Sequence, residues 1–463
     1  MSSTLKFDQG LVEKYGVSGP RYTSYPTAPQ FHEGFDAQAY KQFVAKSNQD
    51  FIPRPLSLYV HLPFCRSLCY FCGCHKKIVG LSKMPDEYLA HLHSEIELQG
   101  KLFDPDREVI QLHFGGGTPT FYDDLQLQEL VDQLGRNFNL SNSQEREFSV
   151  EIDPRTVDEK RIEKLAGMGF NRLSFGVQDF DPAVQDAVNR IQDKSHTLGL
   201  VETAREKSFN SISIDLIYGL PLQTLNSFGV TLDSVIDARP DRLAVYAYAH
   251  LPEKFRAQRM LKIEDLPDSQ TRFELMQLTI EKLTAAGYEY IGMDHFALPQ
   301  DELVKARHTG NLQRNFQGYS VLRNCDLVGL GASAIGKVGY SYSQNYTNIR
   351  QWQASVESGE LPIWRGISLQ RDDLIRRKII ESIMCHGTVN RDEIENRFNI
   401  DYLEYFAGEM KSLQSLANDG LIKISENGFS VTEMGLVLLR AIAMVFDRFL
   451  VNGHRSNSFS KVI

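Results

Sequence analysis

Apolar residues gather in short runs along the first 300 residues, and most runs are bounded by glycine, proline or aspartate. Six runs have the length and residue types of buried strands: 56–64, 108–117, 147–154, 171–180, 211–221 and 241–252. Apolar positions recur at helical spacing in the segments between them, namely 86–103, 123–138, 158–170, 195–209 and 227–240. This alternation predicts βα units and a parallel sheet.

Six βα units are too few for a closed eight-stranded barrel. We expect an α/β fold, a partial (β/α)6 barrel of the TIM type, although a doubly wound sheet would give a similar pattern. Both architectures place their chemistry at the carboxyl ends of the strands. The motifs described below all lie at or just after such an end, which supports this fold class.

The barrel has segments on either side in the sequence. Residues 1–50 are expected to form an N-terminal arm and a lead-in helix, and residues 51–300 the barrel itself. A helix at 268–287 and a strand within 288–297 are predicted near the end of the barrel.

The last third of the chain changes character. Residues 301–368 are rich in Gly, Asn, Gln and Tyr, and they predict a loop-rich extension of the catalytic domain. Residues 369–463 predict a mostly helical, winged-helix-like domain with a hairpin near Asn427 and Gly428. The apolar stretch 436–451 predicts a buried helix. We interpret this domain as a packing module.

Composition and charge restrict the function classes. The chain has 463 residues, 42% of them hydrophobic and 24% charged, as in ordinary globular proteins. A net charge of -9 argues against a nucleic-acid partner, but an acidic protein can hold a basic pocket for a small anion. The N-terminus has no apolar signal segment, and charges interrupt residues 436–451. We expect a cytoplasmic monomer without membrane insertion.

The cysteines are unevenly placed. Four of the six lie within ten residues: Cys65, Cys69, Cys72 and Cys74. Clustered thiols in a cytoplasmic protein indicate metal binding rather than disulfides. A zinc site would normally take two ligands from a distant segment. The remaining Cys325 and Cys385 are isolated and are predicted to be small core residues.

The first three of these cysteines have the spacing CxxxCxxC. Three thiolates on one loop can hold three irons of a [4Fe-4S] cluster and leave the fourth iron open. Radical chemistry with S-adenosylmethionine (SAM) needs that open iron, because the amino and carboxylate groups of SAM bind it. Cys74 follows Cys72 too closely to replace a ligand without distortion, so we predict that it is not one. A zinc site or unligated thiols are the weaker alternatives.

A glycine-rich motif ends the second predicted strand. Residues 115–119 read GGGTP, one βα unit after the cysteine loop. Glycines let a backbone approach a ligand closely, although a glycine run alone often marks only a turn. The combination of CxxxCxxC after a strand with GGGTP resembles the radical SAM superfamily. In that superfamily such a motif holds the amino group of the methionine part of SAM.

The resemblance extends to one family. The motifs RYTSYPTA, YVHLPFCRSLCYFCGC, HFGGGTPT, EIDPR, NRLSFGVQDF, SIDLIYGLP, GMDHFA, RNFQGY and IWRGI are similar to those of the oxygen-independent coproporphyrinogen III oxidases, from about residue 10 onward. The CGC end of the cysteine loop and the RYTSYPTA arm distinguish this family from heme-trafficking relatives. A radical SAM-like heme-binding trafficking protein is the alternative interpretation.

The resemblance implies one [4Fe-4S] cluster with three cysteine ligands and two SAM molecules. Around the first SAM it implies Tyr59, Gly116, Glu151 and Ile335. Around the second it implies Phe71, Gly117, Thr118, Gln178, Arg190, Asp215 and Ala249.

The chemistry of three of these residues agrees with that role. Glu151 and Asp215 lie at predicted strand ends and can accept from ribose hydroxyls or face the sulfonium, and Arg190 can pair with a carboxylate. Each has a plainer alternative, such as a helix cap for Asp215 or a surface ion pair for Arg190. Ile335 and Ala249 rest on the resemblance alone.

The resemblance also implies a reaction. A reductant such as flavodoxin or ferredoxin reduces the cluster, SAM is cleaved, and a 5′-deoxyadenosyl radical removes hydrogen from a propionate β-carbon. Loss of CO2 and one electron leaves a vinyl group, and two such events convert coproporphyrinogen III to protoporphyrinogen IX without oxygen.

Arginine suits the carboxylates of such a substrate. Arg21, Arg314 and Arg365 are candidates, because they lie in polar, aromatic-rich segments. We predict that the arm folds over the site as a lid.

Overall fold

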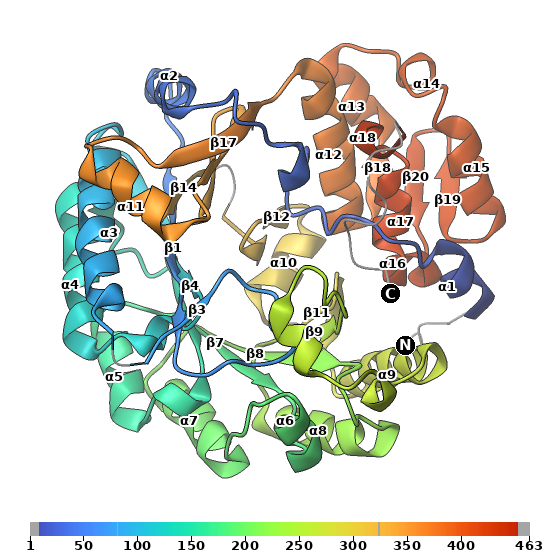
Figure 1. Ribbon diagram of the computed structural model, residues 1–463. Coiled ribbons are helices and arrows are strands. Elements are labelled where there is room, and N and C mark those ends of the chain that lie inside the picture. The colour runs from blue at the N-terminus through green and yellow to red at the C-terminus, as the bar shows by residue number, and fades with distance from the viewer. Residues whose placement is uncertain (1–8, 81, 323–324, 452–463) are drawn as a thin grey trace.

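One large sheet forms the centre of the computed structural model, which describes residues 9–80, 82–322 and 325–451 (Figure 1). All six expected strands are present and run parallel in the order β1-β4-β6-β7-β8-β9. Their bounds are Leu56–Leu62, Glu108–Gly116, Glu147–Ile152, Arg172–Gln178, Ser211–Tyr218 and Arg242–Ala247. The predicted α/β fold with six βα units is confirmed.

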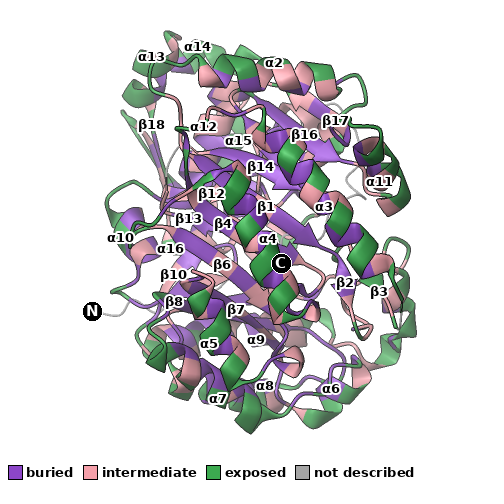
Figure 2. Cartoon of the chain, turned by 90° about the vertical axis from the view of Figure 1, so that its left-hand side faces the viewer, coloured by how far each residue is buried: buried purple, intermediate pink, exposed green. Residues whose placement is uncertain are grey.

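The predicted helices cover the outer face of the sheet. They are α3 (Met84–Gly100), α4 (Asp124–Asn137), α5 (Glu159–Gly167), α7 (Lys194–Glu206), α8 (Leu225–Ala238) and α9 (Ser269–Ala285). Asp123 and Thr224 begin α4 and α8 with capping boxes, which satisfy amide groups at the helix start. Figure 2 shows the strands buried and the outward sides of these helices exposed.

Side chains alternate across each strand, and this separates the core from the lumen of the barrel. In β1, Leu58 and Val60 are fully buried in the core beneath the helices. Ser57 and Tyr59 take the opposite face, because successive residues of a strand point to opposite sides. The inward positions of the other strands are mostly polar, for example Glu147, which lines a cavity inside the barrel. The lumen is therefore suited to a polar ligand.

The prediction of a single strand within residues 288–297 is wrong. The structure has a hairpin there, β10 (Glu289–Gly292) and β11 (His295–Ala297), and β11 pairs antiparallel with β9. Met293 and Asp294 have φ angles of 47° and 71°, and this left-handed pair reverses the chain. Neither residue type signals such a reversal in the sequence.

The expectation of a loop-rich segment over 301–368 is also wrong. The segment forms α10 (Glu302–His308), β12 (Gln313–Asn315), β13 (Gly318–Ser320), β14 (Asp326–Leu330), β15 (Ile335–Val338), β16 (Ser341–Asn345), α11 (Ile349–Glu357) and β17 (Ile363–Ser368). Strand β14 joins β1 in parallel, and β15 to β17 continue the sheet antiparallel. The polar residues that suggested loops are largely strand residues, and every residue of β16 is buried.

The N-terminal arm lies between the barrel and the C-terminal domain. It begins with α1 (Gln9–Tyr15), crosses to the barrel and ends in α2 (Ala37–Asn48), shown in blue in Figure 1. The Tyr22 hydroxyl donates to Asp447 at 3.0 Å, and Arg440 Nε donates to the Pro20 carbonyl at 3.1 Å. His32 forms an antiparallel bridge with Gly366 of β17. The arm is therefore bound to both parts of the molecule.

The C-terminal segment combines helices with a small sheet. Its elements are α12 (Arg371–His386), β18 (Thr388–Asn390), α13 (Arg391–Phe398), α14 (Tyr402–Tyr405), α15 (Met410–Asn418), β19 (Ile422–Ser425) and β20 (Gly428–Val431). The predicted hairpin is present as β19 and β20, and β18 completes a three-stranded sheet.

The prediction of a single helix over residues 436–451 is wrong. The chain forms three short helices instead, α16 (Glu433–Val437), α17 (Leu439–Met444) and α18 (Arg448–Val451). Asp447 accepts from the amide of Phe449 at 3.0 Å, which starts a new helix in place of continuing the old one. The outer parts of the predicted arm and C-terminal domain, residues 1–8 and 452–463, lie outside the described residues.

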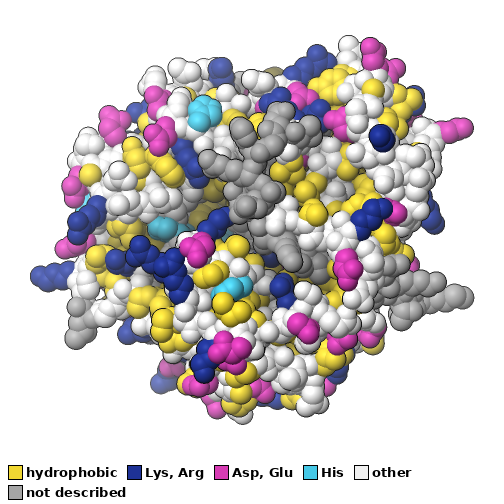
Figure 3. Space-filling model, turned by 45° about the vertical axis from the view of Figure 1, so that its right-hand side comes forward, with side chains coloured by type: hydrophobic (Ala, Val, Ile, Leu, Met, Phe, Trp, Pro, Cys, Tyr) yellow, Lys and Arg dark blue, Asp and Glu magenta, His cyan; other side chains and the backbone are white. Residues whose placement is uncertain are grey.

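The surface carries charges of both signs, and on the face in Figure 3 acidic and basic side chains are interspersed with apolar ones. Within the described ranges, no helix has both the length and the apolar composition needed to cross a bilayer.

Candidate active site

A cavity of about 460 Å³ lies where the parallel strands end. The loop after β1 forms one wall, and the ends of β4, β6, β7 and β8 form the others. A short parallel pair, β2 (Phe64–Cys65) and β3 (Lys77–Ile78), closes the base of this loop. All four cysteines of the loop therefore line one cavity: Cys65, Cys69, Cys72 and Cys74.

Polar hydrogens are directed at two of the predicted ligand sulfurs. The hydroxyl of Thr118 donates to Cys65 Sγ at 3.3 Å. Cys69 Sγ lies 3.5 Å from Nη1 of Arg190 and 3.6 Å from Nη2 of Arg155. Hydrogen bonds and positive charge of this kind stabilise thiolate ligands and tune the metal centre that they hold. All three thiols are free of disulfides.

The donor set fits a cluster better than a single ion. Among the described residues, no three Cys, His, Asp or Glu side chains close around one ion position. Zinc requires such convergence, whereas an iron–sulfur cube binds each thiolate at a different iron. The thiols of one loop and the open space beside them therefore fit a [4Fe-4S] cluster with SAM as a further ligand.

The glycine motif forms the adjoining wall, and steric contacts require glycine there. Gly116 has φ of 120°, and a Cβ at this position would lie 2.9 Å from the ring of His61. A Cβ at Gly117 would lie 2.5 Å from the carbonyl oxygen of Pro63. The amide of Gly116 donates to Glu151 Oε2 at 3.1 Å. The motif thus keeps the backbone close to both the cysteine loop and a carboxylate.

Two carboxylates at the ends of β6 and β8 have opposite pKa shifts. Burial works against the charge of Glu151, but His113, at 3.2 Å, and the Gly116 amide hold its pKa below the usual value. Burial, followed by the charge of Glu151, raises the pKa of Asp215 to about 7. Asp215 also accepts from Ser174 Oγ at 3.2 Å. The pair offers one firmly ionised acceptor and one carboxyl that can hold a proton near neutral pH.

The two plainer alternatives for these residues can now be judged. Arg190 does form an ion pair, with Asp153 at 3.2 Å, but both side chains are buried against the cavity rather than on the surface. Asp215 lies within β8, not at the start of a helix.

Eight of the eleven residues predicted to bind SAM line this cavity together with the cysteines. They are Phe71, Gly116, Gly117, Thr118, Glu151, Gln178, Arg190 and Asp215.

The other three lie behind its wall. Tyr59 stacks on His113 with ring centroids 5.8 Å apart. The carbonyl of Ala249 accepts from Gln258, whose amide also donates to the Phe71 carbonyl. Ile335 begins β15, next to the strand that pairs with β1.

The three candidate substrate arginines are not all together. Arg21 lies 3.9 Å from Asp294 and 5.5 Å from the ring centroid of Tyr246. The charge of Arg314 also reaches Asp294, so these two arginines face the same part of the molecule. Arg365 lies apart on β17, where it donates to Gln344 at 2.8 Å and stacks on its neighbour Trp364.

Sequence reasoning missed several residues of the site. His113 and Tyr246 point into the lumen from β4 and β9, and Arg155 and Asp153 lie under Cys69. His113 and Tyr246 could have been found from the alternation of inward and outward residues along their strands, because each lies two residues from another inward position. Asp153 and Arg155 belong to the EIDPR motif, which supported the family resemblance but did not indicate what these two side chains do.

Comparison with known proteins agrees with this geometry. The Radical SAM superfamily model matches residues 59–235, and the HemN C-terminal domain model matches residues 369–438. The chain is 48% identical to an oxygen-independent coproporphyrinogen III oxidase of Pseudomonas aeruginosa, with 100% of both chains covered. It is 47% identical to the protein of that name from Escherichia coli, with 99% of both covered.

A solved structure, described as coproporphyrinogen III oxidase (HemN) from Escherichia coli, a radical SAM enzyme, superposes with a TM-score of 0.92 at 45% identity. The match covers 96% of this chain and 100% of that one. The superposition extends over the barrel that the sequence indicated, and the identity holds over the full length of the chain. This chain belongs to the oxygen-independent coproporphyrinogen III oxidase family of the radical SAM superfamily.

Proposed function

We propose that the protein converts coproporphyrinogen III to protoporphyrinogen IX by oxidative decarboxylation of two propionate side chains, without oxygen. The observation that carries this proposal is the single cavity onto which the CxxxCxxC thiols, the glycine motif and the Glu151 and Asp215 carboxylates all face. The full-length relatives named as this oxidase support the substrate.

Cys65, Cys69 and Cys72 would hold one [4Fe-4S] cluster, which with SAM bound supplies a 5′-deoxyadenosyl radical. The chain's own contribution is binding and orientation. Gly116 and Gly117 hold the backbone of this wall close to the cysteine loop, since a side chain at either would collide with His61 or Pro63. The exposed backbone of this wall would hold the methionine part of SAM. Glu151 is held ionised and can accept from ribose hydroxyls or attract a cationic group.

A second SAM would lie beside the first. Phe71, Gln178, Arg190 and Asp215 line the cavity on the side of β7 and β8. Arg190 is buried and carries one Nε atom without a hydrogen-bond partner, so it retains a donor for a carboxylate. Asp215 can accept or donate, because its pKa lies near 7.

A radical reaction also requires shielding from solvent. The arm and the segment around β12 line a further cavity together, with Tyr22 and Tyr25 from the arm and Phe316 just after β12. Arg21 and Arg314 come from these two segments and would bind substrate carboxylates near the lumen, with Arg365 as the third candidate.

Three further properties belong to the proposal. An external one-electron donor such as flavodoxin or ferredoxin reduces the cluster, because outside the cysteine loop the sequence holds only two isolated cysteines. The proposed enzyme acts as a monomer. It works in the cytoplasm, where reducing conditions preserve clustered thiols.

The decisive experiment is anaerobic incubation of reconstituted protein with SAM, a reductant and coproporphyrinogen III, followed by product analysis. Protoporphyrinogen IX and 5′-deoxyadenosine are expected. Cys69→Ser should abolish both products, and Cys385→Ser, at a buried cysteine far along the chain, is the matched control. Retention of heme without any decarboxylation would contradict the proposal and favour the trafficking alternative.

A further inference from the structure

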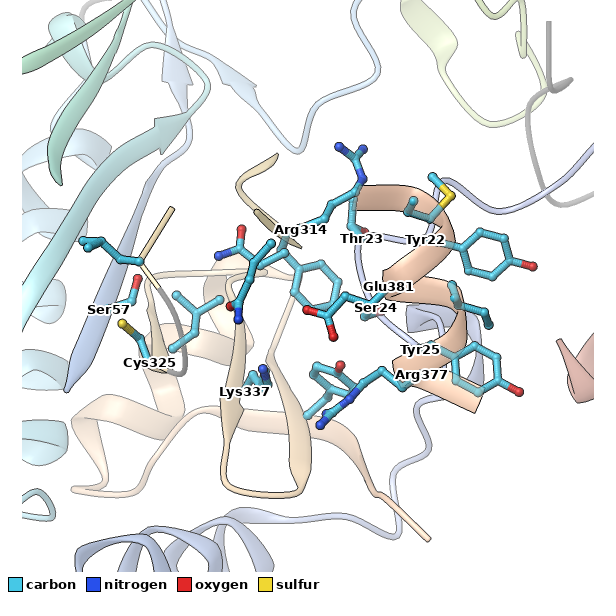
Figure 4. A pocket seen from close by; sticks show the side chains of 18 of the residues that line it. Tyr22, Thr23, Ser24, Tyr25, Ser57, Arg314, Cys325, Lys337, Arg377 and Glu381 are labelled. Carbon is cyan, nitrogen blue, oxygen red and sulfur yellow. The ribbon is translucent and has the colours of Figure 1, made fainter. Parts of the chain in front are cut away.

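A second cavity, of about 60 Å³, lies at the other end of the barrel lumen (Figure 4). Its walls come from the arm at Tyr22–Tyr25, from β12, β14 and β15, and from helix α12. Ser57, near the start of β1, also lines it. At about 3.3 Å per strand residue, the part of β1 from Ser57 to its end at Leu62 places the cavity roughly 15 Å from the start of the cluster loop.

Two basic side chains in this cavity share one carboxylate, that of Glu381. Lys337 interacts with Glu381 and Asp326 through charge alone, and Arg377 has an inaccessible Nη1 atom without a hydrogen-bond partner. Figure 4 shows the two cationic groups near one another, with the carboxylate of Glu381, which lies one helical turn after Arg377 on α12, beside them. Burial, followed by the charge of Arg377, lowers the pKa of Lys337 to about 8. Two half-buried cations beside a single carboxylate leave a net positive charge in the cavity, which an anion placed between them would neutralise.

Other groups around the cavity are also ready for a ligand. The hydroxyl of Ser57 is buried without a hydrogen-bond partner. Arg377 is fixed from behind by a hydrogen bond with Tyr342, which leaves its remaining donors free.

This cavity is continuous with the active site through the lumen. Gln111 and Asn315 line both it and a central cavity of about 190 Å³. The central cavity shares four further residues with the cavity that carries the cysteines: Glu151, Ser174, Asp215 and Tyr246. A single elongated ligand can therefore reach from the cysteine loop toward Lys337 along a polar path.

We propose that Lys337 and Arg377 bind a carboxylate of the substrate at the end of the lumen opposite the radical chemistry. The inference rests on the proposed function. A substrate with four carboxylates, of which one reacts at a time, needs its remote carboxylates held in place. An arginine fork and a lysine ammonium together match a carboxylate in charge and geometry. Tyr22 and Ser24 of the arm form the wall that closes over it.

The test measures binding, so it does not depend on a loaded cluster. Lys337→Met and Arg377→Met are compared with wild type and with Lys378→Met. Lys378 is the neighbour of Arg377 on α12, but its ammonium pairs with Glu393 at 2.8 Å, away from the cavity. The ligands are coproporphyrin III, a fluorescent oxidised analogue with four carboxylates, and its tetramethyl ester, which has none.

The expected result is at least tenfold weaker binding of coproporphyrin III by Lys337→Met and Arg377→Met, with Lys378→Met like wild type. The ester should bind all four proteins alike. The two cavity variants should keep or raise the melting temperature without ligand, because the repulsion between two neighbouring cations has been removed. Lowered melting temperatures with equal losses for the acid and the ester would show a purely structural role and overturn the inference.

Two other results also overturn it. Unchanged affinity of both cavity variants for coproporphyrin III would mean that no substrate carboxylate binds there. Stabilisation of wild type but not of the variants by inorganic phosphate, with porphyrin affinity unchanged, would assign the cavity to a free anion. Failure of wild type and Lys378→Met to bind coproporphyrin III at all would contradict the proposed function itself, and this inference with it.

Discussion

Nη2 of Arg155 lies 3.6 Å from Sγ of Cys69, beneath the cavity that carries the predicted cluster ligands. Asp153 fixes this guanidinium through contacts of 2.6 and 2.9 Å, and it also binds Arg190 at 3.2 Å. Two arginines and one aspartate therefore place a net positive charge next to one ligand sulfur. Positive charge there favours the more negative, reduced state of a cluster.

Arg155→Gln should lower the reduction potential of the cluster. One unit charge at about 5 Å contributes roughly 3 kcal/mol at an effective dielectric constant of about 20, on the order of 100 mV for one electron. Pairing with Asp153 reduces the expected shift to tens of millivolts. The measurement is a potentiometric titration followed by electron paramagnetic resonance. Arg155→Lys keeps the charge and should shift the potential less; equal potentials in all three proteins would refute the electrostatic role.

Three of the four cysteines in the loop should be cluster ligands, and Cys74 should not be one. Replacing Cys65, Cys69 or Cys72 with serine is expected to cost most of the bound iron after anaerobic reconstitution, because a cube with two protein ligands is poorly held. Cys74→Ser should retain the iron, although Cys74 lines the same cavity. Iron content and the visible absorption of the cluster measure this. Loss of iron in Cys74→Ser, with retention in one of the other three, would reassign the ligand set.

Deleting residues 1–25 should impair turnover. The deletion removes a wall of the second cavity, and it takes away the Pro20 carbonyl to which Arg440 donates. Tyr22→Phe separates the effects, since it keeps the wall but loses the hydrogen bond to Asp447, a change expected to cost about 1–2 kcal/mol of unfolding free energy. Steady-state kinetics and urea denaturation together test both. A truncated protein with normal turnover would refute the lid.

Glu95 should make stability depend on pH in an unusual direction. It is fully buried, and burial raises its pKa to about 7, against hydrogen bonds from Gly331, Asn345 and Trp352. A carboxyl with a raised folded-state pKa stabilises the fold fully below its unfolded pKa, and this contribution is lost as the pH rises through about 7. The contribution amounts to about 3 kcal/mol.

The matched variant is Glu95→Gln, which cannot titrate. At pH 5 this variant should be less stable than wild type. The NH2 group of the new glutamine would lie against an N–H group that donates to a carboxyl oxygen of Glu95 in wild type. The difference should shrink between pH 5 and pH 8, as measured by urea denaturation. Parallel pH profiles for the two proteins would show that Glu95 does not titrate in this range.

The features that the sequence predicted well are those encoded by local spacing. The three-residue and two-residue gaps between Cys65, Cys69 and Cys72 place them on one loop whatever the rest of the chain does. Gly116 was recognisable because it belongs to the GGGTP motif, one βα unit after the cysteine loop. The six parallel strands followed from short apolar runs bounded by glycine, proline or aspartate.

The features that it did not predict depend on contacts between distant segments. Lys337 and Arg377 are 40 positions apart in the sequence, and only the pairing of β14 with β1 and the packing of α12 bring them to the lumen. The strands around Lys337 were taken for loops because their inward residues are polar, as lumen residues must be. Ala249 and Ile335 have no chemical signal, since they support the site through backbone and packing.

The measurement that tests the account most directly is the electron paramagnetic resonance spectrum of the reduced, fully iron-loaded protein before and after addition of SAM. If Cys65, Cys69 and Cys72 are the three protein ligands of the cluster, as we propose, one iron has no protein ligand. The account therefore predicts that SAM changes the cluster spectrum in both wild type and Cys74→Ser. An unaltered spectrum at full iron content would contradict it.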